Sequence, residues 1–308
     1  MLVKYTAGSW ILICLGKNIV RKMNQNNHMF IFGLGYVGQH LANSLYKQGW
    51  QITGTTRKPE KLKPSMPTTW QILKFENGDK IPDLNTHLSK ASHVVTTISS
   101  LSGYDPVMRA HSKELSEFNG WTGYISATSV YCDQENGFVD ERVPAAPSTK
   151  RGLARLTAER EWQKACGAEI FRVAGIYGPG RNAILALLEG RARIIKKEGQ
   201  ISNRIHQADI TNIIIAAINK PRPLRIVNLC DEEPAPQEDI IRYAAKLLNV
   251  IPPKPIPFEE ANLTPMARSF YISNRRLRSV ITGPELGVIL KYPNYRKGLN
   301  ALIESQGI

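Results

Sequence analysis

The sequence has few cysteines, no long apolar run and a shortage of acidic residues. Its four cysteines, Cys14, Cys132, Cys166 and Cys230, stand far apart, and no pair has the spacing of a metal site. Isolated cysteines in a long chain are typical of reduced thiols rather than of a disulfide scaffold. The apolar stretch at residues 10–15 is far shorter than the roughly 20 residues that cross a bilayer. We therefore expect a cytoplasmic protein with no metal site and no membrane partner.

The acidic residues number 26 against 40 basic ones, which gives a formal net charge of +14. A strongly basic balance favours anionic partners such as cofactor phosphates or an anionic small-molecule substrate. Basic motifs interleaved with aromatic residues, which would indicate nucleic-acid binding, are missing as well. The charge therefore predicts a small anionic substrate and disfavours a nucleic-acid partner.

The length of 308 residues fits one large domain or two coupled ones. The first strand pattern begins at Met29, and we expect residues 1–28 to be a disordered extension. Two other interpretations of that segment stay open: a signal peptide without a clear cleavage site, and a start codon placed upstream of the true one at Met23 or Met29. We expect a dinucleotide-binding domain over 29–179 and mainly a substrate lobe over 180–308, with some segments returning to the first domain.

Short β-rich segments alternate with amphipathic ones along most of the chain. The expected strands are 29–32, 51–56, 70–75, 93–98, 123–126, 170–173 and 225–229. The expected helices are 37–48, 105–118, 151–165, 182–189, 208–218 and 236–248. Such alternation is typical of α/β proteins with a doubly wound parallel sheet, the Rossmann fold. The later part has fewer strand signals, which predicts a smaller C-terminal substrate lobe over the carboxyl edge of the sheet.

A glycine motif of the G-x-G-x-x-G type follows the first strand and opens the first helix. Gly33 would make the tight turn, Gly35 would let the backbone approach a pyrophosphate, and Gly38 would let the helix pack closely on the strand. The helix N-terminus would supply free N–H groups and a partial positive charge. This context predicts a dinucleotide site that includes Tyr36 and Val37, although a glycine-rich turn in another α/β protein gives the same pattern.

The second strand ends in Thr56, Arg57 and Lys58. An NAD site usually carries an acidic residue here for the ribose 2′-hydroxyl, whereas a guanidinium binds a 2′-phosphate. These three residues therefore predict NADP as the cofactor, with NAD possible. The alternative is that Arg57 is an ordinary surface arginine.

Several motifs occur in the order found in one known family. They are FGLGYVG (32–38), YISATSVY (124–131), FRVAGIYGPGR (171–181), RIHQADI (204–210) and YPNYRKGL (292–299). On these stretches the chain resembles the extended short-chain dehydrogenase/reductase family, the NAD-dependent epimerase/dehydratase superfamily. The resemblance implies a Rossmann domain, a C-terminal substrate lobe, frequent homodimers, and nucleotide sugars or small carbonyl compounds as substrates. The glycine spacing departs from the family's usual GxxGxxG, which indicates an atypical member.

The family's catalytic Ser/Thr, Tyr and Lys are all replaced. The hydroxyl position, four residues before Tyr131, is Ala127, and Arg151 and Arg155 occupy the Tyr and Lys positions. None of the 11 tyrosines is followed by a lysine four places on. Because arginine stays protonated, neither arginine can exchange protons, although each can bind an anion or stabilise an oxyanion.

Six other side chains are candidates for the missing groups. They are Tyr131, His206 and Tyr177 for proton transfer, and Ser126, Thr128 and Ser129 for the hydroxyl. Tyr131 is also interpretable as a buried structural tyrosine, and His206 as a residue that organises the loop before a helix. Tyr177 follows a strand near the place where the family holds the nicotinamide, so we include it among the cofactor-binding residues.

The sequence thus predicts an NADP-dependent oxidoreductase or epimerase of the extended short-chain type, with an unknown substrate. The alternative is a non-catalytic NADP-binding or sensing protein that keeps the fold and has lost the acid/base group. A nucleic-acid-associated protein ranks lowest. Whether the chain is an enzyme stays open at this point.

Overall fold

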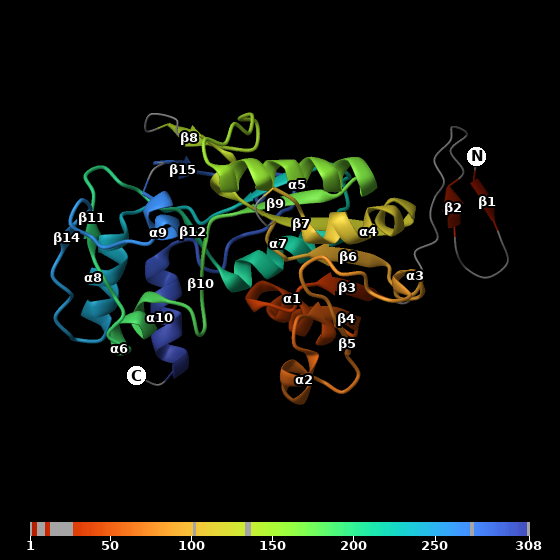
Figure 1. The fold of residues 1–308 in the computed structure, drawn as a ribbon, viewed down its shortest axis with the longest axis horizontal. Coiled ribbons are helices and arrows are strands. Elements are labelled where there is room, and N and C mark those ends of the chain that lie inside the picture. The colour runs from red at the N-terminus through yellow and green to blue at the C-terminus, as the bar shows by residue number, and fades with distance from the viewer. Residues whose placement is uncertain are drawn as a thin grey trace.

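A seven-stranded parallel sheet forms the centre of the molecule (Figure 1). The computed structural model describes residues 2–4, 10–12, 27–100, 103–132, 137–271 and 274–306. The strands are β3 (His28–Phe32), β4 (Gln51–Thr56), β5 (Gln71–Lys74), β6 (His93–Thr96), β7 (Trp121–Ala127), β9 (Glu169–Val173) and β13 (Ile226–Leu229). Their order is β13-β9-β7-β6-β3-β4-β5, and every neighbouring pair is parallel. The predicted doubly wound Rossmann fold is confirmed.

The strand order reverses between β3 and β6. The chain runs outward from β3 to β5, returns to β6 and then continues on the other side of the sheet. In open parallel sheets, ligands bind beyond the carboxyl ends of the strands at such a reversal. The loop that follows β3 therefore lies at the position where this fold binds its ligand.

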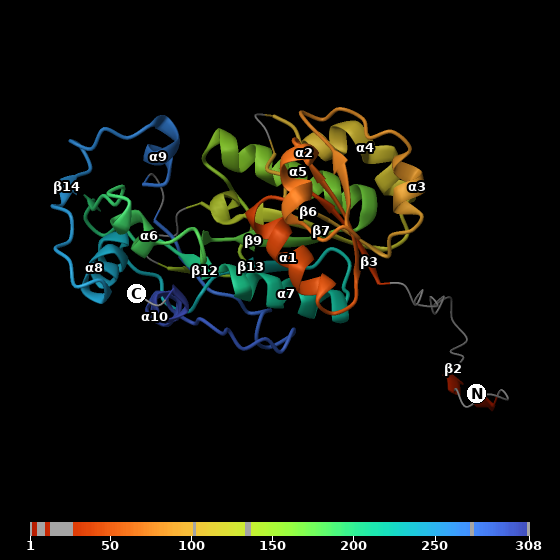
Figure 2. The ribbon, with the colours of Figure 1, turned by 90° about the horizontal axis from the view of Figure 1, so that it is seen from below.

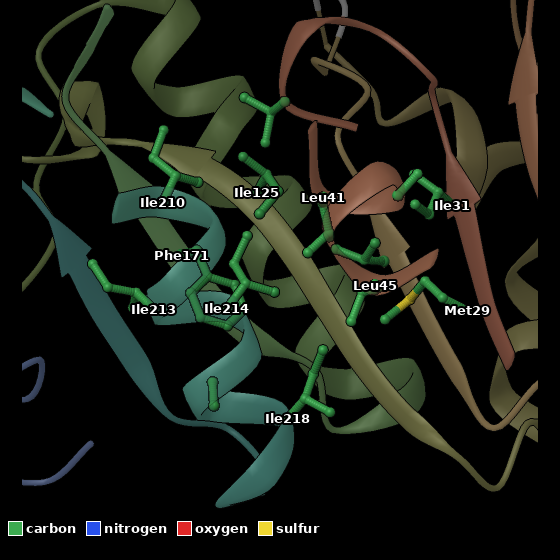
Figure 3. Packing of buried hydrophobic residues seen from close by; sticks show 14 of the residues in the cluster. Met29, Ile31, Leu41, Leu45, Ile125, Phe171, Ile210, Ile213, Ile214 and Ile218 are labelled. Atoms are coloured by element: carbon green, nitrogen blue, oxygen red, sulfur yellow. The ribbon is translucent and has the colours of Figure 1, made fainter. Parts of the chain in front are cut away.

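Helices cover both faces of the sheet because the buried strands alternate apolar residues up and down. Met29 and Ile31 of β3 pack on one face together with Leu41 and Leu45 of α1 (Tyr36–Tyr46), as Figure 3 shows. Ile214 of α7 (Gln207–Asn219) joins the same cluster, and α1 and α7 lie side by side (Figure 2).

The opposite face is covered by α3 (Leu84–Leu88), α4 (Pro106–Glu117) and α5 (Lys150–Cys166). Phe30 and Phe32 of β3 point to this side, where they pack with apolar residues of these three helices. Both clusters are nearly excluded from water, so the sheet is a rigid support for its carboxyl-edge loops.

A smaller lobe is built mainly from the C-terminal third of the chain (Figure 1). It contains α6 (Ala183–Leu188), β11 (Ile195–Lys196), α8 (Gln237–Leu247), β14 (Ile256–Pro257), α9 (Pro265–Ser269) and α10 (Tyr295–Gln306). Two short parallel pairs, β10 (Gly175–Tyr177) with β12 (Arg204–His206) and β8 (Phe138–Val139) with β15 (Arg276–Leu277), complete the connections. Helix α7 and strand β13 lie after residue 180 in the sequence but belong to the large domain.

Most predicted elements are present within a few residues of their expected bounds. The predictions missed α10 and the short helices α2 (Pro59–Leu62), α3 and α9, of which the three short ones follow no long apolar pattern. Within the expected extension, Leu2–Lys4 (β1) and Trp10–Leu12 (β2) pair as antiparallel strands, and His28 already belongs to β3. The rest of that extension up to residue 26 lies outside the described residues, so its expected disorder stays a prediction. None of the helices in the described part of the chain is long and apolar enough to span a bilayer.

Candidate dinucleotide and substrate site

The loop after β3 is held between its two neighbouring strands. Gly33 has a φ of +94°, a conformation that favours glycine, and its N–H donates to Thr55 Oγ1 of β4 at 2.9 Å. Its carbonyl oxygen accepts a 2.6 Å hydrogen bond from Thr97 Oγ1, which follows β6. Leu34 N–H donates to the Thr55 carbonyl at 2.7 Å. The loop is thus anchored on both sides of the point where the strand order reverses.

The other two glycines of the motif have different roles. A Cβ on Gly38 would lie 2.1 Å from the Gly33 carbonyl oxygen, so the close approach of α1 to the loop requires glycine there. A Cβ on Gly35 would meet no atom within 4 Å, so Gly35 borders open space at the N-terminus of α1. The first turn of α1 contains no acidic residue. An anion can therefore approach the free N–H groups and positive dipole end of this helix.

The end of β4 presents two basic side chains to solvent. Arg57 and Lys58 are both exposed, while Thr56 is half-buried. Within the described residues the Arg57 guanidinium has no hydrogen bond, ion pair or ring contact. Lys58 makes hydrogen bonds only through its backbone, from its N–H to Thr56 Oγ1 and to its carbonyl oxygen from Lys61 N–H. Both side chains are free to bind a phosphate from outside.

Tyr36 and Val37 of the glycine motif point in different directions. Val37 is buried in the cluster beneath α1. Tyr36 donates its hydroxyl to the Pro179 carbonyl at 3.0 Å and lies 2.8 Å from the Cβ position of Gly178. Burial raises the pKa of the Tyr36 phenol. Tyr36 therefore connects the glycine motif to the loop that leads into the small lobe.

Tyr177 and His206 come together, but inside the small lobe. Their rings meet edge to face at 5.1 Å, and a Cβ on Gly298 of α10 would lie 2.1 Å from the Tyr177 hydroxyl. His206 Nδ1 accepts from Ala208 N–H at 3.1 Å and so caps α7. Burial lowers the pKa of His206 to about 4, which keeps its ring neutral. Both side chains serve packing and capping. His206 Nε2 lies 3.4 Å from the Cβ position of Gly178, beside which the Tyr36 hydroxyl of the glycine motif also lies.

Tyr131 is a buried residue of the large domain. Its side chain is 1% exposed, its hydroxyl donates to Asn228 Oδ1 at 2.9 Å, and the Arg172 guanidinium lies 4.7 Å from its ring centre. Burial raises its pKa further above neutrality. These contacts match the interpretation of Tyr131 as a structural tyrosine and give it no acid/base partner.

Sequence reasoning missed a buried ion pair beside Tyr131. Glu159 of α5 and Arg172 of β9 join through a bidentate contact with a shortest distance of 2.7 Å, and both are nearly inaccessible. The hydroxyl of Ser126 donates to Glu159 at 2.5 Å, so this serine is not free to replace the missing catalytic hydroxyl. The signal that could have revealed the pair was a charged residue in the middle of an otherwise apolar buried strand.

Arg151 and Arg155 lie one turn apart at the start of α5, beside the carboxyl end of β7. Arg155 is buried, and its Nη1 donates to the Tyr124 hydroxyl at 3.2 Å and to the Ile125 carbonyl at 3.1 Å. Arg151 is more exposed, and its guanidinium lies 5.4 Å from the ring centre of Phe270 in the small lobe. The positions where the family carries Tyr and Lys thus hold two fixed positive charges.

Among the described residues, no three His, Cys, Asp or Glu side chains are grouped to hold a metal. No protein-family model matches the chain.

Comparison with known proteins gives both sequence and structure relatives. A conserved protein of unknown function from Silicibacter pomeroyi is 39% identical, with a TM-score of 0.84, over 91% of this chain and 99% of that one. The chain belongs to the same family as this Silicibacter protein. Protein YeeZ of Escherichia coli K12 is 28% identical over 240 residues, which cover 73% of this chain and 85% of YeeZ.

The fold of this family is that of the extended short-chain dehydrogenase/reductases. The UDP-glucuronic acid 4-epimerase of Bacillus cereus, solved in complex with NAD, aligns with a TM-score of 0.71 over 91% of this chain and 99% of the epimerase. Its identity of 17% makes this a likeness of fold. The resemblance that the sequence motifs carry is thereby confirmed at the level of architecture.

Proposed function

We propose that this protein binds NADP(H) and acts as an oxidoreductase or epimerase on a small anionic substrate. The observation that carries the proposal is the open N-terminus of α1 at Gly35, one strand away from the unpartnered guanidinium of Arg57. The helix end suits the pyrophosphate, and Arg57 with Lys58 suits a ribose 2′-phosphate. An acidic residue in place of Arg57 would favour NAD instead.

The residues on the substrate side set limits on the chemistry. Bound NADP(H) supplies or accepts a hydride. In this chain the side chains at the family's Tyr and Lys positions, Arg151 and Arg155, hold fixed positive charge and transfer no proton. They can hold an anionic group or stabilise negative charge that develops on a carbonyl oxygen. A proton needed by the reaction then has to come from another donor, such as water.

A second candidate function is non-catalytic NADP binding or sensing. It is favoured by one observation: Tyr131, Tyr177 and His206, the proposed proton donors, are all committed to buried structural contacts. Such a protein would keep the cofactor cradle and respond to the cofactor's redox state or concentration without turnover.

A homodimer, a cytoplasmic location and the absence of a nucleic-acid partner remain predictions from the sequence. The net charge of +14 agrees with the proposed cofactor phosphates and with a small anionic substrate.

Thermal-shift titration with NADP, NADPH, NAD and NADH tests the cofactor proposal. Ligand at 100 times its dissociation constant stabilises the folded state by about 2.7 kcal/mol, so the preferred dinucleotide should raise the Tm by several degrees. Substituting Arg57→Asp should lower the affinity for NADP roughly 10- to 100-fold, because one charge-assisted contact contributes about 1.5–3 kcal/mol. The affinity for NAD, which lacks the 2′-phosphate, should not fall.

Lys61→Asp is the matched control, since it makes the same charge change on the exposed side of nearby helix α2. Equal weakening by both substitutions would mean that the effect is one of net charge and that Arg57 lies outside the site. NADPH oxidation monitored over a panel of small carbonyl acids then separates the two functions. Turnover supports the oxidoreductase, and tight binding without turnover supports the sensing protein.

A further inference from the structure

The first turn of α5 concentrates positive charge that no carboxylate of the described residues neutralises through an ion pair. Lys150 and Arg151 occupy that turn, Arg155 follows one turn later, and the turn contains no acidic residue. The free N–H groups of a helix N-terminus already carry partial positive charge, and Asp or Glu ordinarily stabilises this end. Cations at this position destabilise the 17-residue helix unless an anion is bound.

Two buried donors near this turn lack an acceptor. Arg155 is 5% exposed, and its Nε has no hydrogen-bond partner among the described residues, although Nη1 is fully engaged. The buried Oγ of Ser129 also has none there. Ser129 adjoins the first turn, because a Cβ on Gly152 would lie 2.4 Å from its carbonyl oxygen. Buried donors without acceptors are rare in native proteins, which points to an acceptor that arrives with a ligand.

The surrounding acidic groups do not neutralise the two arginines. Asp105, at the N-terminus of α4, is the buried carboxylate on whose pKa the charge of Arg155 acts, but no ion pair joins the two side chains. Its Oδ1 accepts from two N–H groups of α4, and its Oδ2 has no hydrogen-bond partner among the described residues. The next pair along α5, Glu159 with Arg172, neutralises itself. Burial and then the charge of Arg155 lower the pKa of Arg151, although the group stays protonated at neutral pH.

We propose that the first turn of α5 is an anion site that binds the carboxylate or phosphate group of the substrate through Arg151 and Arg155. The site that transfers a proton in relatives of this fold would here hold a negative charge. β7 is separated from β3 by β6 alone, so its carboxyl end lies roughly 10 Å along the sheet edge from the glycine motif. The exposed aromatic ring of Phe270 in the small lobe lies 5.4 Å from the Arg151 guanidinium, so the small lobe borders the site on this side.

This inference rests on the proposed function, and the experiment separates the two. The Tm of the full chain is measured against inorganic phosphate and against acetate at constant ionic strength, with and without saturating NADP. We expect one of these anions to raise the Tm even when NADP occupies the phosphate sites at the glycine motif and Arg57. A larger Tm shift with phosphate would indicate a phosphorylated substrate, and a larger shift with acetate would indicate a substrate with a carboxylate group.

Arg151→Gln should lower the affinity for that anion about tenfold or more, because it removes one charged donor, and it should leave the affinity for NADP unchanged. Arg160→Gln is the matched control, since Arg160 is an exposed arginine of the same helix that makes no side-chain hydrogen bond or ion pair with any described residue. Arg151→Lys, which keeps the charge, should restore part of the affinity and shows that the effect is not a folding defect.

Three results would overturn the anion site: no anion response in the NADP-loaded wild type, an anion response that NADP abolishes, or equal responses in the Arg151→Gln and Arg160→Gln variants. The second of these results would place the anion in the dinucleotide cradle. If NADP does not change the Tm of the wild type, but the anion raises it and Arg151→Gln removes this effect, the proposed cofactor is wrong and the anion site is supported.

Discussion

A methyl group at Gly35 should abolish dinucleotide binding while leaving the fold intact. Gly35 adopts φ −82° and ψ −161°, which alanine accepts, and a Cβ there meets no atom within 4 Å. Alanine is a weaker N-cap than glycine, by about 1 kcal/mol, but it reduces the conformational entropy of the unfolded chain, which stabilises the folded state by about 0.4–1 kcal/mol. The free energy of unfolding should therefore change by less than about 1 kcal/mol.

The effect on the cofactor should be much larger. The open space at Gly35 is where a pyrophosphate would contact the free N–H groups of α1, and a methyl group would hold it away. A hydrogen bond to a charged oxygen contributes about 1.5–3 kcal/mol, so losing one or two lowers the affinity for NADPH roughly 10- to 10,000-fold.

Gly38→Ala provides the contrast within the same motif. Its Cβ would lie 2.1 Å from the Gly33 carbonyl oxygen, so α1 or the loop has to move. Overpacking of this kind destabilises by about 1–3 kcal/mol, which lowers the Tm by about 2–4 °C for each kcal/mol. Thermal unfolding and NADPH fluorescence titration measure both variants. If Gly35→Ala binds NADPH as tightly as the wild type, the pyrophosphate does not lie against Gly35 and the reasoning from the cradle fails.

Two further predictions concern the buried interior. Glu159→Gln leaves the Arg172 guanidinium buried without its counter-charge and should destabilise the protein by about 3–5 kcal/mol in urea unfolding. The double variant Glu159→Met, Arg172→Met should recover most of the lost stability. A Glu159→Gln variant as stable as the wild type would contradict the importance of this ion pair. The folded pKa of His206 is about 4, below its ordinary value of 6.5, so its contribution to stability is complete above pH 6.5 and is lost as the pH falls toward 4, by roughly 3 kcal/mol in total. The variant His206→Asn keeps a capping side chain and should lose less stability over that pH range, and identical pH profiles for the two proteins would refute the assignment.

The geometry of the glycine loop was predictable because its requirements are local. Gly33, Gly35 and Gly38 fall within one strand-to-helix turn, and each demand on them follows from backbone geometry alone. The exposed arginine at the end of β4 follows by position from the same unit. A single βαβ unit fixes where all these residues lie, so a linear pattern is enough to predict them.

The surroundings of the candidate proton donors were not predictable, for the opposite reason. Whether Tyr131, Tyr177 or His206 is available depends on residues far away in the chain, such as Asn228 for Tyr131 and Gly298 for Tyr177. The sequence contains the residue types but not the contacts that commit them. The buried pair of Glu159 and Arg172 escaped notice for the same reason, because its partners lie on different elements.

The glycine motif and the first turn of α5 therefore differ in how each would bind an anion. The glycine motif needs an anion and a backbone that can approach it, and the chain retains both requirements at Gly35 and Gly38. At α5 the chain places two guanidiniums at a helix end that disfavours cations. Chance loss of catalysis would remove the family's Tyr and Lys without placing like charges together. Because Arg151 and Arg155 repel each other and the helix dipole, their joint presence is best explained by a ligand whose negative charge offsets both.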